Sequence, residues 1–366
     1  MRVLINRSDA IGDTLLTLPM AKLLKEYDPK IHITFIVSKK SINLFANLTY
    51  VDEIIEWKDY GGTINTFWSF FNKLKKCSAD AYFYVGGSHM PSLIAKIIGI
   101  KFRGGLKSRP STFFLLNRGV RQKRSLVEMH ESDYNLNLLA PLGVHYDFDK
   151  RNNYRPEIIL TEKEIAEAML HFTKDLASKA ITYNDNLIFI HPGMSGHTLN
   201  WPSRNYARVI SRLERRVPGK YIYVVSYTPA DQAYLKVLNS ELEKSEYDKV
   251  RERIFFFDGS KRGLRNYMSV LSKGQLFIGP STGTTHIANS LKIKTVAIYS
   301  PIKVQSAMRW GPFDRTENHC RVVVPDVICG EQFACLGTEC PYYDCMMKIE
   351  VDDVAGAALD LLTMGV

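Results

Sequence analysis

Two runs of alternating strand and helix, joined by a polar linker, predict an α/β protein built from two Rossmann-like domains. In each run, short apolar segments alternate with longer segments whose apolar residues recur at helical spacing. Strands that are separated by helices pair in parallel and form a sheet covered on both faces. The chain has 366 residues, which is the length of two such domains. Its hydrophobic content of 45% and charged content of 23% are typical of a globular protein.

The first run, which we assign to an N-terminal domain of residues 1–150, begins with an apolar strand and ends at a linker. Its expected strands are Val3–Asn6, Ile31–Val37, Glu53–Trp57 and Tyr82–Val85, and its expected helices are Asp13–Tyr27, Lys40–Ala46, Thr63–Lys76, Pro91–Ile98 and Glu131–Leu142. The segment from Val144 to Arg155 is polar and precedes a proline, as linkers often do. It separates the two predicted domains.

The second run predicts a C-terminal domain of residues 151–350. Its expected strands are Leu187–His191, Tyr221–Val225, Ile254–Phe257, Gln275–Ile278 and Thr295–Ile298, and its expected helices are Thr161–Ser178, Arg204–Arg216, Ala230–Glu243, Leu264–Lys273 and Thr282–Leu291. Residues 351–366 contain a final amphipathic helix, Val351–Leu362. We treat this helix as a separate segment, and one arrangement open to it is to pack back toward the N-terminal domain.

A turn rich in glycine and hydroxyl residues follows the predicted strand Gln275–Ile278. Ser281, Thr282 and Gly283 come directly after that strand, at the start of a helix. The first turn of a helix carries a partial positive charge and free N–H donors, so it suits a phosphate or diphosphate. His286 lies one turn into the helix and can join the same site. The alternative is an ordinary helix start, because small hydroxyl residues are common N-caps.

A second tight turn follows the first predicted strand and places Asp13 in the first turn of a helix, directly after Gly12. Both turns lie beyond the carboxyl ends of strands, where open parallel sheets bind ligands. Neither turn has the Gly-x-Gly-x-x-Gly pattern of dinucleotide-binding proteins, and the chain has no Gly-x-x-x-x-Gly-Lys-Ser/Thr motif. Nicotinamide and P-loop chemistry are therefore disfavoured.

Four motifs in this order resemble the family 9 glycosyltransferases, the lipopolysaccharide heptosyltransferases. They are Gly12-Asp13-x-Leu15-x-x-x-Pro19, His191-Pro192-Gly193 followed by Trp201-Pro202, Ser281-Thr282-Gly283-x-x-His286-x-Ala288, and Cys340-Pro341-x-x-x-Cys345-Met346. The resemblance extends from Met1 to about Leu362. It implies the GT-B fold, in which two Rossmann-like domains face each other across a central cleft.

The resemblance implies an inverting transfer of a sugar from a nucleotide to an acceptor hydroxyl. The family's catalytic aspartate falls on Asp13, which a helix N-terminus would keep ionised as a general base. Asp9 is a nearby competitor, and a simple dipole role for Asp13 is the alternative. Gly12 is expected on the acceptor side. The residues expected to bind the donor are Gly193, Asp231, Ser281, Thr282, Gly283, Thr284 and His286.

The expected chemistry needs no metal ion and no cofactor. No Asp-x-Asp element is suited to hold an ion against the diphosphate, and enzymes of the GT-B fold generally work without a bound metal. Hydroxyl and backbone donors would then stabilise the departing nucleotide diphosphate. The expected partners are a nucleotide-sugar donor, ADP-heptose or a similar compound, and a lipid-linked lipopolysaccharide core acceptor.

Two positions depart from the family pattern, and both affect donor recognition. Leu199 stands where family members often carry a lysine that meets the donor phosphates, and Ser281 stands where they often carry an aspartate. His197, Arg204 or Lys261 could replace the lost contact. These departures leave two alternatives open, a different nucleotide-sugar donor or a relative that binds glycan or nucleotide without turnover.

The formal net charge of +10 arises largely from one basic stretch, Lys101 to Arg124, which contains eight cations and no acid. No nucleic-acid-binding motif is visible, and the cations are not interleaved with aromatic residues that look exposed. An anionic membrane surface or a phosphorylated acceptor explains the charge, and a solvated loop is the alternative. We expect Lys107, Arg109, Arg121 and Lys123 to bind the acceptor.

The expected location is the cytoplasm, with peripheral association with the inner membrane. No apolar run approaches the roughly 20 residues that span a bilayer. The N-terminal strand contains Arg2 and Arg7 and lacks the small-residue cleavage site of a signal peptide. Five of the six cysteines lie between Cys320 and Cys345 without paired Cys-x-x-Cys spacing. A packed structural role, a zinc site and disulfides all remain open for them.

Overall fold

The computed structural model describes residues 1–58, 64–108, 110–330 and 334–364. Its contacts divide the chain into two compact units, Met1–Ile159 and Leu160–Val366. The boundary therefore lies slightly beyond the predicted position at residue 150, which falls inside a 3-10 helix, Phe148–Tyr154. Among the described residues, no helix is both long enough and apolar enough to cross a bilayer.

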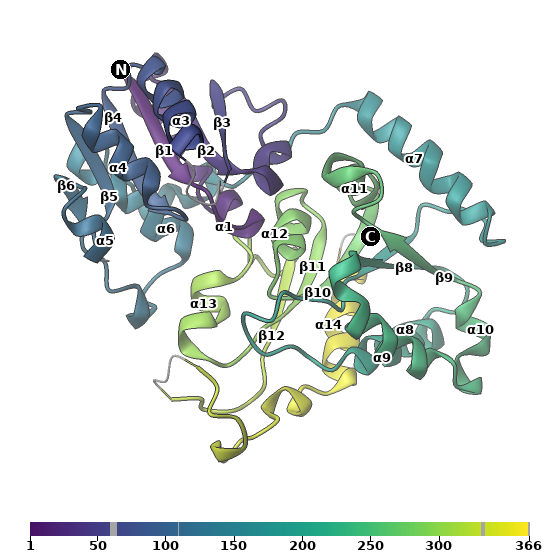
Figure 1. The fold of residues 1–366 in the computed structure, drawn as a ribbon. Helices are drawn as coiled ribbons and strands as arrows, with labels where there is room; N and C mark the ends of the chain where they lie inside the picture. The colour runs from purple at the N-terminus through teal and green to yellow at the C-terminus, as the bar shows by residue number, and fades with distance from the viewer. Residues whose placement is uncertain (59–63, 109, 331–333, 365–366) are drawn as a thin grey trace. The chain divides into compact units, whose positions relative to one another are not determined.

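The first unit contains a six-stranded sheet in the order β3-β2-β1-β4-β5-β6, and every paired strand runs parallel to its neighbour (Figure 1). The strands are β1 (Arg2–Arg7), β2 (His32–Ser38), β3 (Glu53–Trp57), β4 (Ala81–Gly86), β5 (Phe102–Leu106) and β6 (Arg118–Val120). In the centre of the sheet, Ile5 of β1 pairs with Phe35 on one side and with Phe83 on the other. All three side chains are fully buried, as the apolar runs predict.

Helices cover this sheet between its strands. They are α1 (Ile11–Leu15), α2 (Pro19–Tyr27), α3 (Ile64–Lys76), α4 (Met90–Ile97), α5 (Pro110–Phe113) and α6 (Glu131–Leu136), with 3-10 helices at Lys39–Leu44, Arg124–Leu126, Asn137–Leu142 and Phe148–Tyr154. The predicted helix Asp13–Tyr27 is wrong as one element. It is interrupted before Pro19, which occupies the first turn of α2, because a proline lacks the N–H that continues a helix.

The basic stretch holds structure that the sequence did not reveal. Lys101 to Arg124 contains β5, α5 and β6, which form the outer edge of the first sheet. Two adjacent glycines in β5 hid the strand, because glycine has a low strand propensity. Gly105 has a φ of 114°, and a Cβ there would lie 2.0 Å from the carbonyl oxygen of Tyr84. Only glycine allows the two strands to approach at this point.

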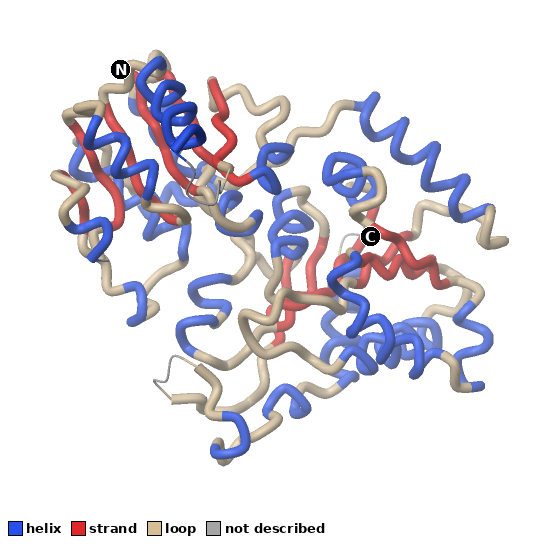
Figure 2. The backbone as a smooth tube through the Cα atoms, viewed as in Figure 1, coloured by secondary structure: helices blue, strands red, loops and turns tan. Residues whose placement is uncertain are grey.

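The second unit contains a sheet of the same topology, in the order β12-β11-β10-β7-β8-β9, again with parallel pairs. Its strands are β7 (Leu187–Ile190), β8 (Ile222–Tyr227), β9 (Ile254–Asp258), β10 (Gly274–Pro280), β11 (Lys294–Ile298) and β12 (Cys320–Val323). Its helices are α7 (Glu162–Ala177), α8 (Ser203–Arg216), α9 (Gln232–Leu242), α10 (Asp248–Arg251), α11 (Gly263–Leu271), α12 (Gly283–Ser290), α13 (Ala307–Trp310) and α14 (Val351–Thr363). Figure 2 shows the alternation of helices and strands along both units.

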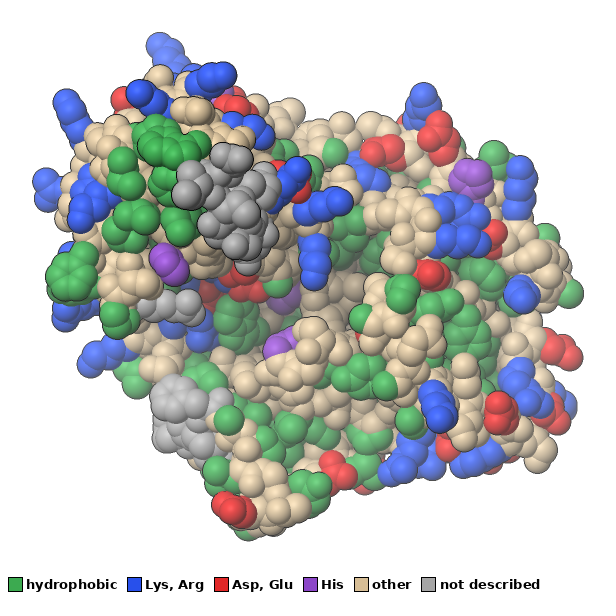
Figure 3. Space-filling model, viewed as in Figure 1, with side chains coloured by type: hydrophobic (Ala, Val, Ile, Leu, Met, Phe, Trp, Pro, Cys, Tyr) green, Lys and Arg blue, Asp and Glu red, His purple; other side chains and the backbone are tan. Residues whose placement is uncertain are grey.

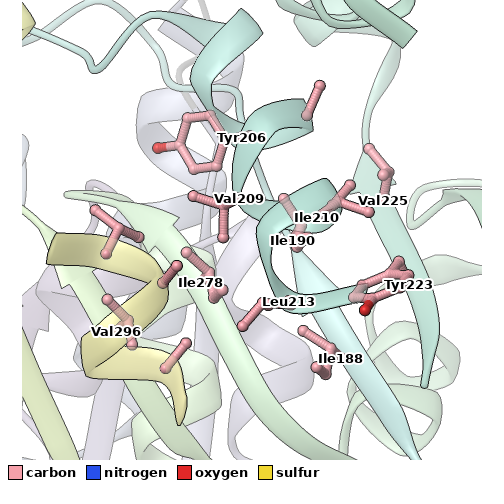
Figure 4. Packing of buried hydrophobic residues seen from close by; sticks show 14 of the residues in the cluster. Ile188, Ile190, Tyr206, Val209, Ile210, Leu213, Tyr223, Val225, Ile278 and Val296 are labelled. Carbon is pink, nitrogen blue, oxygen red and sulfur yellow. The ribbon is translucent and has the colours of Figure 1, made fainter. Parts of the chain in front are cut away.

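The core of the second unit forms where α8 packs on the sheet. Val209, Ile210 and Leu213 of α8 lie among side chains of β7, β8, β10 and β11 (Figure 4). The final helix α14 belongs to the same cluster and contacts α8, β10, β11 and β12. These contacts place α14 in the core of the second unit. The indole of Trp201 fixes the approach to α14 by donating to the carbonyl oxygen of Ile349 at 3.1 Å.

The order of the strands reverses direction at one place in each sheet. In the first sheet the chain builds outward from β1 through β2 and β3, and then continues on the other side of β1 with β4. In the second sheet the same reversal occurs between β7 and β10. The loops that follow two such strands diverge and leave a crevice at their carboxyl ends, which is where open α/β sheets bind ligands. The fold therefore marks one candidate site in each unit.

Candidate functional sites at the two strand-order reversals

The loop after β1 is tied to the loop after β4, at the reversal in the first sheet. Asn6 Nδ2 donates to the carbonyl oxygen of Ser88 at 2.8 Å, and the Ser88 N–H donates to Ser8 Oγ at 3.0 Å. Between them, Gly87 has a φ of 79°, and a Cβ there would lie 2.5 Å from Ser8 Oγ. The two loops therefore form one connected base for the helix that carries Asp13.

Asp13 lies in the first turn of α1, and its carboxylate is oriented by a hydrogen bond from Arg7. Arg7 Nη2 donates to Asp13 Oδ1, while Arg7 Nε donates to Asp9 Oδ1 at 2.9 Å. The Arg7 side chain is 4% exposed, whereas the Asp13 side chain keeps 25% of its surface exposed. Thr17 Oγ1 also donates to the Asp13 carbonyl oxygen at 2.9 Å. The carboxylate is thus oriented on one side and open to solvent on the other.

The guanidinium of Arg7 is buried, and the acidic side chains around it stabilise its charge. Its Nη1 donates to the Val85 carbonyl oxygen at 3.2 Å and lies 3.6 Å from Glu131 Oε1. Burial by itself lowers the pKa of Arg7, but the charges of Asp13, Asp9 and Glu131 outweigh burial and raise that pKa above its ordinary value. Arg7 is therefore a permanent cation.

Asp9 and Asp13 share this one guanidinium, so the structure brings the predicted base and its competitor together. Burial raises the pKa of Asp9 above its ordinary value, the charge of Arg7 opposes this, and the charge of Asp13 adds to it. A proton is consequently easier to place on Asp9 than on an ordinary aspartate. The side chains are 33% exposed for Asp9 and 25% exposed for Asp13.

Glu131 extends the network to a residue of the basic stretch. Its side chain is 1% exposed and accepts from Arg124 Nη1, while Arg124 Nε donates to Gln122 Oε1 at 2.8 Å. Asn135 Nδ2 then donates to the Leu16 carbonyl oxygen at 3.1 Å, which joins α6 to the end of α1. Arg124 is therefore structural rather than part of a cationic surface.

The other predicted acceptor residues lie at the edge of the same sheet. Lys107 and Arg121 both stack on the ring of Phe113, with the charged groups 4.7 and 5.2 Å from its centroid, and Lys123 is exposed. Arg109 lies outside the described residues. The expectation that no exposed aromatic residue accompanies these cations is wrong, because Phe113 and the following phenylalanine are both exposed.

At the reversal in the second sheet, β10 runs directly into the predicted donor turn. Thr282 is the N-cap of α12 in an extended conformation, and its side chain makes no capping hydrogen bond. Its Oγ1 lies 2.6 Å from Thr284 Oγ1 instead, while Ser281 and His286 are largely buried. The predicted row of hydroxyl groups and first-turn N–H groups is thus assembled at one helix N-terminus. Such a terminus favours an anion.

The loop after β7 supplies the neighbouring part of this site. A Cβ at Gly193 would lie 2.1 Å from Asp231 Oδ1, so these two predicted donor residues are in direct contact. Asp231 Oδ2 accepts from the N–H and from Oγ1 of Thr228, both at 2.8 Å. Asp231 as a residue is 6% exposed, and its carboxylate lies against the backbone at Gly193. The geometry gives Asp231 a supporting place in the loop.

His191 connects the two loops of the second site. Its N–H donates to the Ile278 carbonyl oxygen of β10 at 2.9 Å, and its Nδ1 lies 2.9 Å from the Ser226 carbonyl oxygen of β8. A carbonyl only accepts, so Nδ1 carries the proton. Burial lowers the pKa of His191, although the charge of Asp231 opposes the shift. The imidazole is therefore neutral near pH 7.

Leu199, at the position where family members often carry a lysine, has apolar surroundings. The Leu199 side chain packs against the apolar core and lines a cavity of about 190 Å³ together with Cys329, Cys335, Cys340 and Cys345. Asn200 Nδ2 donates to the Pro192 carbonyl oxygen at 2.8 Å. His197 and Arg204, two suggested replacements, contact Ser195 Oγ and Met347 Sδ.

The six cysteines are free thiols. Within the described ranges, no three histidine, cysteine or acidic side chains are arranged to hold a metal ion. Burial raises the pKa of Cys345 above its ordinary value, with further contributions from the neighbouring thiols Cys329, Cys335 and Cys340. These four thiols line the cavity beside Leu199, and Cys345 is the buried one among them.

Sequence reasoning missed the residues beneath Asp13, above all Arg7 and Glu131. One signal was present, because an arginine in an otherwise apolar buried strand needs acidic partners. Asp9 and Asp13 follow that arginine closely in the sequence, whereas Glu131 and Val85 do not. The sequence could thus have indicated the ion pair but not its buried surroundings.

Comparisons with known proteins identify the family of the chain. Residues 67–333 match the family model described as glycosyltransferase family 9 (heptosyltransferase). A candidate glycosyltransferase of Haemophilus influenzae is 25% identical over 335 residues, which cover 88% of this chain and 89% of that protein. The lipopolysaccharide core heptosyltransferase OpsX of the same organism is 21% identical over 366 residues, covering 96% and 94%.

Two solved structures share the fold. A family 9 glycosyl transferase from Veillonella parvula gives a TM-score of 0.76 at 19% identity, covering 99% of this chain and 97% of that chain. The ADP-heptose lipopolysaccharide heptosyltransferase II of Escherichia coli gives 0.75 at 17% identity, covering 99% and 98%. The predicted α/β fold of the GT-B class is confirmed.

Proposed function

The chain belongs to glycosyltransferase family 9, and on that premise we propose that it transfers a heptose from ADP-heptose to a lipopolysaccharide core acceptor. Membership of the family makes the chain a glycosyltransferase of the heptosyltransferase type. The donor and the acceptor are the proposed part. They are supported by the names of two similar proteins, a lipopolysaccharide core heptosyltransferase and an ADP-heptose heptosyltransferase.

One observation carries the donor site in this proposal. Gly193 follows β7 and Ser281 to Gly283 follow β10, so the predicted donor residues flank the strand-order reversal of the second sheet from both sides. The first turn of α12 would place N–H groups and the hydroxyls of Thr282 and Thr284 against a diphosphate. His286 would donate to a phosphate or sugar oxygen from the same helix.

The proposed reaction needs a base on the acceptor side, and Asp13 takes that role. Its carboxylate would accept the proton of the acceptor hydroxyl while the hydroxyl oxygen attacks the anomeric carbon. The bond from that carbon to the nucleotide diphosphate then breaks, and the configuration at the carbon inverts. Gly12, the buried residue directly before the base, is proposed on the acceptor side with it.

Arg7 orients the base, because its guanidinium donates to Asp13 and, through a second nitrogen, to Asp9. The guanidinium is itself held in place by ion pairs with Asp9 and Glu131. We therefore assign Arg7 as a positioning residue.

The proposed scheme assigns the stabilisation of the leaving diphosphate to protein groups rather than to an ion. Hydrogen-bond donors that are fixed before the reaction stabilise charge as it develops. The candidates are the hydroxyls and N–H groups at the start of α12, together with the imidazole of His286. Neither a metal ion nor an organic cofactor has a step in this scheme.

Acceptor binding is assigned to the basic edge of the first unit. Lys107, Arg121 and Lys123 would meet phosphate groups of the core or its lipid, and Arg109 is proposed with them. The lipid part of such an acceptor would hold the enzyme at the cytoplasmic face of the inner membrane. Charge of this sign attracts anionic substrates and surfaces.

The position of Leu199 favours a second candidate, the same reaction with another nucleotide sugar. Leu199 packs against the core, where family members often carry a lysine for the donor phosphates. A panel of nucleotide sugars in a thermal-shift assay separates the two, because a ligand that binds the native state raises its apparent stability. The first candidate requires ADP-heptose to give the largest shift, and a larger shift from a uridine- or guanosine-linked sugar would support the second.

A further inference from the structure

Two adjacent phenylalanines project from the edge of the first sheet. Phe114 is 77% exposed and Phe113, the last residue of α5, is 36% exposed. Their rings meet edge to face with centroids 5.2 Å apart. Contact between aromatic surface and water is unfavourable. Exposed aromatic pairs are therefore more often found where a protein binds another surface.

Cations surround this aromatic pair. Lys107 and Arg121 stack on the Phe113 ring, and Lys96 Nζ of α4 donates to the Phe114 carbonyl oxygen at 3.1 Å. In the described part of the first unit, none of these three cations forms an ion pair. Figure 3 shows Lys and Arg side chains projecting around exposed apolar ones on this unit.

The sequence adds further positive charge to the same edge and no negative charge. Lys101, Arg118 and Lys123 are exposed as well, and the stretch from Lys101 to Arg124 has no acidic residue. A surface on which unpaired cations surround a projecting apolar group is complementary to anionic headgroups above an apolar layer.

The arrangement fits a lipid surface better than a nucleic acid. Single-stranded nucleic acids bind by stacking bases on the open faces of aromatic rings. Here Lys107 and Arg121 already lie over the Phe113 ring, so that ring has little face left for a base. Among the described residues, no cation is placed over the Phe114 ring, which projects as a group that inserts between lipid headgroups would.

We propose that Phe113, Phe114, Lys96, Lys107 and Arg121 form a docking surface for a bilayer that contains anionic phospholipids. Phe114 enters the boundary between headgroups and acyl chains, and the cations contact the lipid phosphates. This inference deepens the proposed function, on which it rests for a lipid-linked acceptor. It explains how the enzyme would reach a substrate held in a membrane.

Vesicle co-sedimentation of the full-length protein tests the surface. The protein is expected to bind vesicles of phosphatidylcholine with phosphatidylglycerol and to bind pure phosphatidylcholine at least tenfold more weakly, since each cation near an anionic surface contributes about fivefold. Phe114→Ser should weaken binding by about tenfold through the loss of the inserted ring. Lys107→Ser combined with Arg121→Ser should weaken it by about tenfold or more and flatten its salt dependence.

Matched variants control for general effects of these changes. Phe148→Ser removes another phenylalanine of the first unit that is 64% exposed, and Lys236→Ser with Lys249→Ser removes two exposed lysines of the second unit. Both controls should bind vesicles as the wild type does. An unchanged melting temperature and circular dichroism spectrum for Phe114→Ser show that its fold is intact.

Three results would overturn the docking surface. They are wild-type vesicle binding by Phe114→Ser, equal binding to neutral and anionic vesicles, or preferential binding of a short single-stranded RNA that competes with vesicles. Transfer to a deacylated acceptor separates this inference from the function on which it rests. Transfer without vesicle binding contradicts the surface alone, and vesicle binding without any sugar transfer contradicts the proposed function alone.

Discussion

Arg7 and Asp13 are joined by a hydrogen bond from Nη2 to Oδ1 that links a buried strand to the first turn of the following helix. The arginine is 4% exposed and the aspartate 25% exposed, so the pair crosses from the interior to the surface. The same guanidinium also binds Asp9 and lies beside Glu131. One buried cation thereby fixes the orientation of the carboxylate that we propose as the base.

Replacing the base should abolish most of the turnover and leave the donor bound. Asp13→Asn keeps the shape of the side chain and removes its ability to accept a proton, so kcat should fall by about 10²–10⁴-fold. The Kd for the donor should stay within about twofold, because the donor turn is assigned to the second unit. Asp9→Asn is the matched control, and a larger loss in that variant would move the base to Asp9.

Changes at Arg7 should separate positioning from charge. Arg7→Met removes the buried cation that Asp9 and Asp13 share and should lower the free energy of unfolding by about 3–5 kcal/mol. Arg7→Lys keeps a cation but loses the planar fork that binds two carboxylates at once. In that variant we expect a lower kcat with an unchanged Kd for the donor. Wild-type kcat in Arg7→Lys would show that the orientation of Asp13 does not depend on the guanidinium.

A methyl group at Gly193 should disturb the donor site. The Cβ of Gly193→Ala would lie 2.1 Å from Asp231 Oδ1. Either the loop after β7 must therefore move, or Asp231, whose carboxylate is hydrogen-bonded to Thr228, must move. We expect the Kd for the donor to rise by about tenfold, equivalent to the loss of one well-placed contact of about 1.4 kcal/mol. Gly356→Ala is the control, because a Cβ there meets nothing within 4 Å. Equal donor affinity in both variants would remove this loop from the donor site.

Stability should depend on pH through His191. Its pKa is lowered in the folded state by burial, so below about 6.5 the unfolded chain binds a proton that the folded chain does not. The contribution of this group is complete above about pH 6.5 and is lost as the pH falls below that value. Chemical denaturation of the wild type and of His191→Asn from pH 8 to 5 measures the difference. An identical slope in both proteins would show that His191 is not the group responsible.

Removing divalent ions should leave activity unchanged, since the proposed scheme assigns the diphosphate to protein donors. The measurement is the rate of transfer after dialysis against a chelator, with magnesium restored as the control. Activity that is lost and then restored by magnesium would contradict the metal-free scheme. If chelation instead unfolds the protein, the cysteines around the cavity beside Leu199 hold a structural ion.

The regular parts of the fold could be predicted because their apolar patterns are local. The strand Glu53–Trp57 was predicted to the residue, and the two donor and base turns fall where the patterns place them. The strands β5 and β6 were missed because glycines and cations interrupt them and their stability comes from pairing, of β5 with β4 and of β6 with β5. A sequence pattern reports only the strand propensity of the residues themselves, whereas the formation of an edge strand also depends on the strand with which it pairs.

The candidate sites show the same limit. Ser281, Thr282 and Gly283 carry their own signal, since a strand, a turn and a helix start are adjacent in the sequence. The network around Arg7 has no such local signal, because Val85 and Glu131 are distant from Arg7 in the sequence and contact it only in the folded protein. The contact between Gly193 and Asp231 also joins residues that are distant in sequence, and it depends on the neighbouring strands β7 and β8.

A transfer assay with a heptose-free lipopolysaccharide core acceptor and ADP-heptose tests the central claim most directly. We expect the purified protein to add a heptose whose anomeric configuration, determined by nuclear magnetic resonance, is opposite to that of the donor. The Asp13→Asn protein should show almost no transfer while its thermal shift with the donor is preserved. Transfer of a different sugar in preference to heptose would contradict the proposed donor, and a product with retained configuration would contradict the role of Asp13.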